Sequence, residues 1–132
     1  MICIDGTGSI SHVSIRHRPQ IFNQPYTYSA VSVRGKQNNV RVIEGPVPKS
    51  KIFGAAGTGN GLGHSTFGLP RFNSSTFTSR FPFGNIQFAD DSFDLNVNLT
   101  GWSPFIPTDE DASSLPLAAL EYDFTNNTND LL

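Results

Sequence analysis

The chain has 132 residues, and its 37% hydrophobic content includes 11 Phe, which together suffice for the core of one domain. A net charge of −2, with only 15% charged residues, argues against a nucleic-acid binder, because such a protein needs a basic face to displace counterions from phosphate. The single cysteine excludes an internal disulfide and a cysteine-type zinc site, and no apolar run is long enough to span a bilayer.

Short β-strands are predicted from the N-terminus onward, because apolar residues recur with period two and no segment has the period of an amphipathic helix. Residues 9–15, 26–34 and 39–44 are strand candidates. The segment "RGKQNN" (34–39) contains Gly and Asn between two β-rich runs, which indicates a hairpin turn. Residues 46–79 are rich in Gly, Ser and Thr, and we predict a long loop there.

The C-terminal half carries the clearest strand signals. Residues 83–88 and 93–101 are joined by "ADD" (89–91), which predicts a second hairpin. In 93–101 the residues Phe93, Leu95, Val97 and Leu99 alternate with polar ones, as in a half-buried antiparallel strand. Residues 117–124 repeat the alternation, with Leu120, Tyr122 and Phe124 directed inward. These signals predict an all-β fold, an antiparallel β-sandwich.

Two glycine-rich segments resemble phosphate-binding loops only superficially. The stretch 54–63 lacks the Gly-Lys-Ser/Thr end of a Walker loop, and no helical period follows it. The segment "GTGS" (6–9) precedes a predicted strand instead of a helix. A flexible loop and a tight turn that permits close backbone approach are the better interpretations, so no cofactor is predicted.

Adjacent carboxylates at Asp109, Glu110 and Asp111 stand in a Pro- and Ser-rich connection between two predicted strands. A glycoside hydrolase needs two carboxylates about 5–10 Å apart across its substrate, whereas adjacent acids in a turn usually face water. We therefore predict that these three residues are solvated. The same prediction applies to Asp90 and Asp91 in the expected hairpin turn.

Histidine and serine give no stronger indication of chemistry. The His residues at 12, 17 and 64 match no ligand spacing, so no metal site is predicted. Ser14, Ser74 and Ser75 would be nucleophiles only beside a base, and the Gly-x-Ser-x-Gly elbow is missing. Trp102, Tyr26 and Tyr28 are candidates for stacking on sugar rings, although core packing explains most aromatics in a Phe-rich sandwich.

Six motifs in a fixed order resemble the N-terminal region of the β-glucosidase family that includes bile-acid β-glucosidase, also called non-lysosomal glucosylceramidase (glycoside hydrolase family 116-like). The resemblance covers nearly the whole chain, and the segment 103–114 is its most specific part. The motifs are "GTGSIS" (6–11), "QIFNQP" (20–25), "VRVIEGP" (40–46), "FGLPRF" (67–72), "FPFGNIQFAD" (81–90) and "WSPFIPTDEDASSLPLAALEYDFTN" (102–126).

The resemblance implies an N-terminal antiparallel β-sandwich, a following (α/α) barrel as its partner, and retaining hydrolysis of β-glycosides. It implies that both catalytic carboxylates lie in the barrel, which these residues do not include, so no catalytic residue is assigned to this chain. It also implies that the segment with residues 109–111 joins two strands of the sandwich. The family's sandwich is longer than this chain, which therefore resembles its first half.

The family resemblance also suggests candidates for residues that approach the substrate cleft or the barrel. Family members have two Gly and an aliphatic residue where "CID" (3–5) stands here, and a Trp where Pro19 stands. The candidates adjoin these recognisable motifs and include a glycine turn. They are Gly6, Thr7, Gly8, Ser9, Gln20 and Asn23.

The leading hypothesis is therefore a non-catalytic N-terminal domain of a β-glucosidase- or glucosylceramidase-type enzyme, which packs on the barrel and shapes the substrate cleft. The alternative is a stand-alone carbohydrate-binding module that uses Trp102 and the Tyr pair. A third interpretation is a fragment without independent function, whose unpaired sheet edges would favour aggregation.

Overall fold

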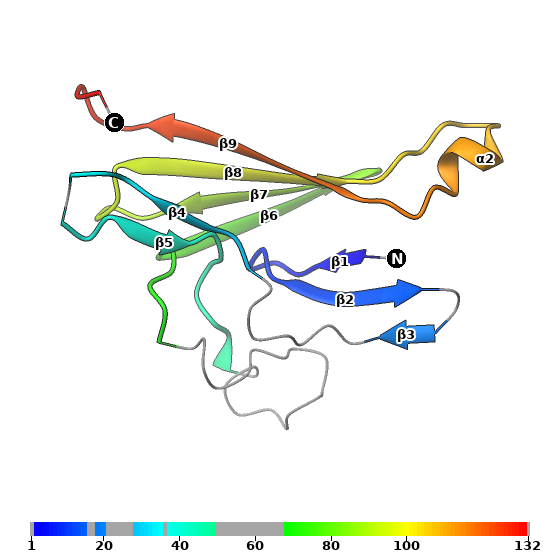
Figure 1. The fold of residues 1–132 in the computed structure, drawn as a ribbon, viewed down its shortest axis with the longest axis horizontal. Helices are drawn as coiled ribbons and strands as arrows, with labels where there is room; N and C mark the ends of the chain where they lie inside the picture. Colours follow the sequence, from blue (N-terminus) through cyan, green and yellow to red (C-terminus); the bar gives the residue numbers. More distant parts are fainter. Residues whose placement is uncertain (1, 16–17, 21–27, 36, 50–67, 132) are drawn as a thin grey trace.

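The computed structural model of the chain describes residues 2–15, 18–20, 28–35, 37–49 and 68–131. Within these residues it contains nine strands and one short helix (Figure 1). The strands are β1 (Ile2–Ile4), β2 (Ile10–Ile15), β3 (Arg18–Gln20), β4 (Ala30–Ser32), β5 (Val40–Val42), β6 (Ser74–Arg80), β7 (Phe83–Ala89), β8 (Leu95–Trp102) and β9 (Ala119–Asn126), and the helix is α2 (Glu110–Ser113).

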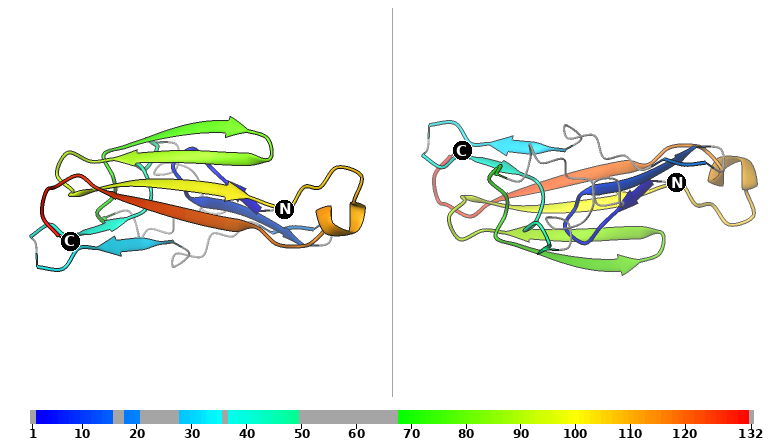
Figure 2. Two further views of the ribbon diagram at one scale, coloured as in Figure 1. Left: turned by 90° about the horizontal axis from the view of Figure 1, so that it is seen from above. Right: turned by 90° about the horizontal axis from the view of Figure 1, so that it is seen from below.

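The strands form three antiparallel sheets that are arranged in two layers. One layer is the four-stranded sheet β6-β7-β8-β9, in which each strand pairs with the next one in sequence. The other layer consists of the sheets β1-β2-β3 and β4-β5, which lie side by side against one face of the four-stranded sheet (Figures 1 and 2). The predicted antiparallel sandwich is thus confirmed.

Cross-strand register explains which face of the four-stranded sheet is buried. Ile86 is paired with Leu99, and Phe88 with Val97. These four side chains are at most 2% exposed. Because side chains alternate along a strand, the residues between them, such as Gln87 of β7 and its partner Asn98 of β8, face outward. The apolar face receives the second layer, and the polar face remains open.

The core is built where this face meets the segments that follow β4 and β5. Phe72 packs against Phe88 and Phe93, with ring centroids 5.5 and 5.6 Å apart. Val33 and Ile43 complete the contact from the second layer. Burying aromatic side chains of this size supplies a large part of the driving force for folding in a chain with modest hydrophobic content.

A glycine lets the β1-β2-β3 sheet approach the four-stranded sheet closely. A Cβ atom on Gly101 would lie 2.6 Å from Cδ1 of Ile4, which is closer than real contacts allow. Ile4 is accordingly packed against the core cluster. The lack of a side chain at this position of β8 therefore creates the space that β1 needs.

The clearest strand predictions agree with the structure. The predicted strands at 93–101 and 117–124 correspond to β8 and β9, and the predicted hairpin at 34–39 joins β4 to β5. Gly35 and Asn38 have φ angles of 79° and 58° in this turn. Such left-handed conformations explain why Gly and Asn stand there.

The boundary of the predicted long loop was wrong at its C-terminal end. Residues 74–80 form β6, which pairs along its whole length with β7. Ser75 and Phe77 face the second layer, and the remaining side chains are mostly exposed. An edge strand with small polar residues lacks the apolar alternation on which strand prediction depends. Residues 50–67, the glycine-rich part of that loop, lie outside the described residues.

Asp90 also differs from its prediction. Its side chain is 1% exposed and its carboxylate lies 2.7 Å from Nε of Arg41. The other carboxylate oxygen accepts hydrogen bonds from Nδ2 of Asn73 (3.0 Å), the backbone N of Ser92 (2.8 Å) and the Ser92 hydroxyl (2.6 Å). Asp90 is therefore a buried structural anchor, whereas its neighbour Asp91 is exposed as predicted.

Hydrogen bonds determine how Asp90 ionises. Burial alone raises the pKa of its carboxyl group, but the hydrogen bonds from Ser92 and Arg41 and the charge of Arg41 outweigh that effect, so the pKa lies below its usual value. The Arg41 guanidinium in turn lies 5.0 Å from the centre of the Phe93 ring. A charged pair is thereby held inside the end of the sandwich where the β7–β8 turn lies.

Two features are absent from the part of the chain that the structure describes. No helix there is long and apolar enough to cross a membrane. No group of three or more His, Cys, Asp or Glu side chains in the same part of the chain could hold a metal ion.

Candidate functional site

A cavity of about 320 Å³ lies between the two layers, beside the turn that joins β1 to β2. Two candidate site residues from the sequence analysis, Gly8 and Tyr28, contribute to its wall. The rest of the wall comes from segments that are far apart in the sequence. The lining residues are Gly8, Ile10, Tyr28, Ser29, Ile43, Glu44 and Tyr122.

Three polar side chains of the cavity, those of Ser29, Tyr122 and Glu44, have hydrogen-bond partners. The hydroxyl groups of Ser29 and Tyr122 are 2.9 Å apart. The Glu44 carboxylate accepts a hydrogen bond from Nε of Arg71 at 3.1 Å, and both of these side chains are buried. In this arrangement the carboxylate is a hydrogen-bond acceptor for Arg71. The hydroxyl groups and the Tyr28 ring suit a small polyhydroxyl group more than an ionic one.

The turn "GTGS" is organised by the residue that precedes it. The Asp5 carboxylate accepts hydrogen bonds from the backbone N of Thr7 (2.8 Å), the Thr7 hydroxyl (2.6 Å) and the backbone N of Ser9 (3.3 Å). The backbone N of Gly8 donates to the Asp5 carbonyl at 2.9 Å. The backbone N–H groups of Thr7, Gly8 and Ser9 are therefore all used within the turn, which makes it a rigid support, and the exposed Gly6 lies at its outer edge.

Gly8 is required at its position for two reasons. Its φ angle is 84°, a conformation that residues with a side chain rarely adopt. A Cβ atom on it would also lie 2.6 Å from Cζ of Phe88, in the core of the four-stranded sheet. The turn thus rests directly on the core through this residue. The carbonyl oxygen of the preceding residue, Thr7, accepts a hydrogen bond of 2.8 Å from the backbone N of Gly45. This bond connects the turn to the segment after β5.

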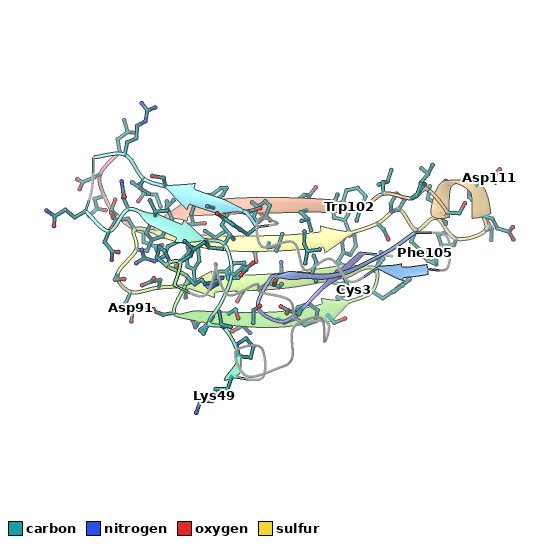
Figure 3. The ribbon with its side chains drawn as sticks, turned by 60° about the horizontal axis from the view of Figure 1, so that its bottom comes forward. Cys3, Lys49, Asp91, Trp102, Phe105 and Asp111 are labelled. Carbon is teal, nitrogen blue, oxygen red and sulfur yellow. The ribbon has the colours of Figure 1, made fainter. Side chains whose placement is uncertain are left out.

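The three adjacent carboxylates lie elsewhere, in the connection between β8 and β9. Asp109 is the N-cap of α2, and its side chain accepts a hydrogen bond from the backbone N of Ala112 at 2.9 Å. Glu110 and Asp111 occupy the first turn of the helix and are exposed. Figure 3 shows Asp111 at the end of the molecule opposite Asp91. The prediction of solvated acids in a connection between two strands is confirmed for all three.

The comparison with protein families decides what kind of domain this is. A family model described as "beta-glucosidase 2, glycosyl-hydrolase family 116 N-term" matches residues 1–132. The chain belongs to the family of N-terminal domains of glycosyl-hydrolase family 116. A comparison with curated proteins gives no match.

The family 116 domain brings together only part of the residues predicted to form a site. Gly6, Thr7, Gly8 and Ser9 share the turn described above, and Ser9 is buried. Gln20 is the last residue of β3, where it is paired with Val13. Asn23 and Tyr26 lie outside the described residues.

The two described aromatic candidates lie on opposite faces of the four-stranded sheet. Tyr28 lines the cavity on the inner face and is 42% exposed. Trp102 alternates with the buried Gly101 at the end of β8 and is therefore directed to the outer face. A single stacking platform that combines these two rings is not formed.

Several residues that build the site of the family 116 domain have no strong sequence signal. Arg71 and Glu44 are 27 residues apart, so no local pattern links them. Asp5 does have a signal, because Asp followed two residues later by Thr is typical of a side-chain-supported turn. Asp5 is the last residue of "CID", the segment in which this sequence departs from the family's usual pattern. In the structure its carboxylate holds the turn together.

Proposed function

We propose that this chain is the non-catalytic N-terminal domain of a β-glucosidase- or glucosylceramidase-type glycoside hydrolase, and that it packs on the catalytic (α/α) barrel and shapes the substrate cleft. The observation that carries the proposal is the family match over residues 1–132. The β-glycoside substrate is bound through the barrel and not by this domain alone.

The state of the buried carboxylates supports a non-catalytic role. Asp90 is paired with Arg41, and Glu44 is paired with Arg71. A glycosidase needs one carboxyl group that is protonated near neutral pH and a second one facing it. The hydrogen bonds and the charge of Arg41 hold the pKa of Asp90 below its usual value, so this carboxylate is unsuited to donate a proton.

The hydrolysis of an aryl β-glucoside tests the catalytic part of this proposal. The purified chain is expected to release no aglycone above the buffer rate, because both catalytic groups are supplied by the barrel. Asp90→Asn and Glu44→Gln serve as controls for trace contamination, since a contaminating enzyme would be unaffected by them. Turnover that disappears in either variant would contradict the proposal.

Binding to a barrel tests the packing role. The chain is added to the separately produced (α/α) barrel of a family 116 β-glucosidase, and binding is followed by isothermal titration calorimetry together with kcat/KM for the glucoside. We expect saturable binding and a rise in kcat/KM. An unchanged barrel at saturating chain concentration would contradict the proposal.

The candidate cleft residues have a test of their own in the same assay. We propose that Gly6, Thr7, Gly8 and Ser9, together with Gln20 and Asn23, lie at the cleft or at the interface with the barrel. The double variant Gln20→Ala/Asn23→Ala is expected to lower the kcat/KM of the complex. Kinetics equal to those of the unaltered complex would remove these two residues from the proposal.

A second candidate function is a stand-alone carbohydrate-binding module. The cavity that joins the Tyr28 ring to the hydroxyl groups of Ser29 and Tyr122 favours it, because aromatic rings stack on sugars while hydroxyl groups bind their polar edges. Titration with glucosides is the test, with tyrosine fluorescence reporting on the cavity and Trp102 emission reporting on the outer face. A saturable signal that Tyr28→Ala abolishes would support this function.

A further inference from the structure

Exposed apolar side chains gather at one end of the sandwich, on the β6–β7 turn, the first residue of β7 and the β8–β9 connection. The Phe81 and Phe105 rings, one from the turn and one from the connection, are in contact, with centroids 4.9 Å apart. Phe81 is 76% exposed and Phe105 is 50% exposed. We call the whole group the end patch. It consists of Phe81, Phe83, Phe105, Ile106, Leu115 and Leu117, each at least 47% exposed.

The end patch is about as large as the largest apolar patch of a typical monomer. If each Phe side chain offers roughly 200 Å², the exposed parts of its three Phe come to about 350 Å². That already lies within the range of about 300–600 Å² for the largest apolar patch on a typical monomer, and the Ile and two Leu add to it. The largest apolar patch of a monomer is often functional, and larger patches mark surfaces that bind another protein.

The end patch has a rim of negative charge. Residues 80–83 and 103–118 contain three acidic residues, Asp109, Glu110 and Asp111, and a single basic one, Arg80. Glu110 and Asp111 are exposed on α2, next to the apolar residues of the connection (Figure 3). A partner that covers the patch must therefore present basic side chains around an apolar centre.

We propose that the end patch is the surface by which this domain docks on the catalytic barrel, and that the barrel face opposite it is apolar and bordered by Lys or Arg. The inference rests on the proposed function, which supplies the partner, and it adds the contact surface and its chemistry. The apolar centre supplies binding energy through burial, and the acidic rim fixes orientation and speeds association.

Charge argues against a second copy of the chain as the occupant. A symmetric pair joined through the end patch would place the acidic rim of one copy against that of the other. The two segments of each copy, 80–83 and 103–118, carry three carboxylates and one guanidinium. Like charges at close range are repulsive, so a basic-rimmed partner is the better fit.

Paired variants of the full chain test the apolar centre. Phe81→Ser/Phe105→Ser removes the two rings in contact, and Val40→Ser/Leu131→Ser removes two exposed apolar side chains outside the end patch. Circular dichroism melting checks that each variant is folded, which we expect because all four side chains are exposed. Calorimetric titration with the barrel should give a Kd raised at least about 30-fold for the first variant, as for central interface residues, and about unchanged for the control.

A charge variant tests the rim and does not depend on the aromatic residues. Glu110→Lys/Asp111→Lys should raise the Kd about tenfold at low salt and converge with the unaltered chain at high salt, because salt screens exposed charges beyond about 10 Å at 0.1 M. Equal binding by both end-patch variants and the control would overturn the surface assignment alone. Failure of the unaltered chain to bind would instead overturn the proposed function. Self-association that Phe81→Ser/Phe105→Ser abolishes would assign the patch to a second copy and overturn the inference.

Discussion

Gly8 is the single residue through which the β1–β2 turn rests on the core. We expect Gly8→Ala to lower the free energy of unfolding by about 2–3 kcal/mol, because the methyl group overpacks Phe88 and the positive φ is strained. Gly35 provides a matched control, since its φ of 79° is similar and a Cβ there would have no atom within 4 Å. Gly35→Ala should cost about 1 kcal/mol. Urea unfolding measures both, and equal losses would contradict the role of the Phe88 contact.

Asp90 makes the stability of the domain depend on pH. Its folded-state pKa lies below the usual value, so its ion pair contributes stability that is complete above the unfolded pKa of about 4 and is lost as pH falls through the lower folded pKa. The free energy of unfolding should therefore fall below about pH 4 in the unaltered chain. Asp90→Asn should flatten this dependence and cost about 3–5 kcal/mol at neutral pH, because Arg41 is left buried without a counter-charge.

Measuring urea unfolding from neutral pH into the acid range compares the two proteins. Asp91→Asn is the control, since Asp91 is exposed on the same turn. It should keep both the stability and the pH dependence of the unaltered chain. An unchanged acid dependence in Asp90→Asn would show that another carboxylate is responsible.

Residue roles were predictable only where the cause is local. The solvation of residues 109–111 follows from their position in a Pro- and Ser-rich connection between two strands. The burial of Asp90 does not, because its partner Arg41 is 49 residues away and the next residue, Asp91, has the same chemistry but opposite exposure. A carboxylate is buried when a distant arginine neutralises it, and no pattern within the turn carries that information.

At the scale of elements, the difference between β8 and β6 shows what a strand pattern can predict. The alternation of Leu95, Val97 and Leu99 with polar residues identifies β8 because its inner face needs large apolar side chains. The inner face of β6 at Ser75 lies against the backbone of Gly45 and needs a small side chain. Its sequence therefore resembles a loop, and pairing with β7 determines its conformation.

The middle of β8 contains a polar atom without a partner. Oδ1 of Asn98 is buried and accepts no hydrogen bond within the described residues. Asn98→Thr should raise the free energy of unfolding by about 1 kcal/mol, because it removes the unsatisfied acceptor and introduces a residue that favours strands. Thermal unfolding followed by circular dichroism measures the change.

Asn96 is the matched control on the same strand. It is exposed, and its Nδ2 donates to Oδ1 of Asn127 at 2.9 Å. Asn96→Thr removes that hydrogen bond but introduces a residue that favours strands. Because the two effects oppose each other, the free energy of unfolding should change by less than about 0.5 kcal/mol. A stabilisation equal to that of Asn98→Thr would attribute the whole effect to strand preference.

For the whole molecule, the sequence predicted a sandwich but not how its second layer is divided. Sheets β1-β2-β3 and β4-β5 are separate, and each reaches the four-stranded sheet through a few contacts. These contacts include Gly101 against Ile4 and Ser29 with Tyr122. Contacts across such sequence separations depend on shape and are not encoded in the alternation of any one strand.

Unequal burial predicts unequal opening of the sheets. The core cluster includes Ile86, Phe88, Val97 and Leu99 of the four-stranded sheet. Ile4 of β1, by contrast, is only partly buried and packs against that cluster from outside. In hydrogen exchange, amides of the β1–β2 pair should exchange at least about tenfold faster than those of the β7–β8 pair. Equal protection of the two pairs would show that the layers open together.

The meander order β6-β7-β8-β9 has a kinetic consequence. Each pairing in that sheet joins neighbours in the sequence and closes a short loop, whereas the ion pair of Arg41 with Asp90 and the Ser29–Tyr122 contact span 49 and 93 residues. Local contacts form at a lower cost in chain entropy than distant ones. We expect residues 74–126 to assemble first during refolding and to serve as the template on which the N-terminal third of the chain condenses.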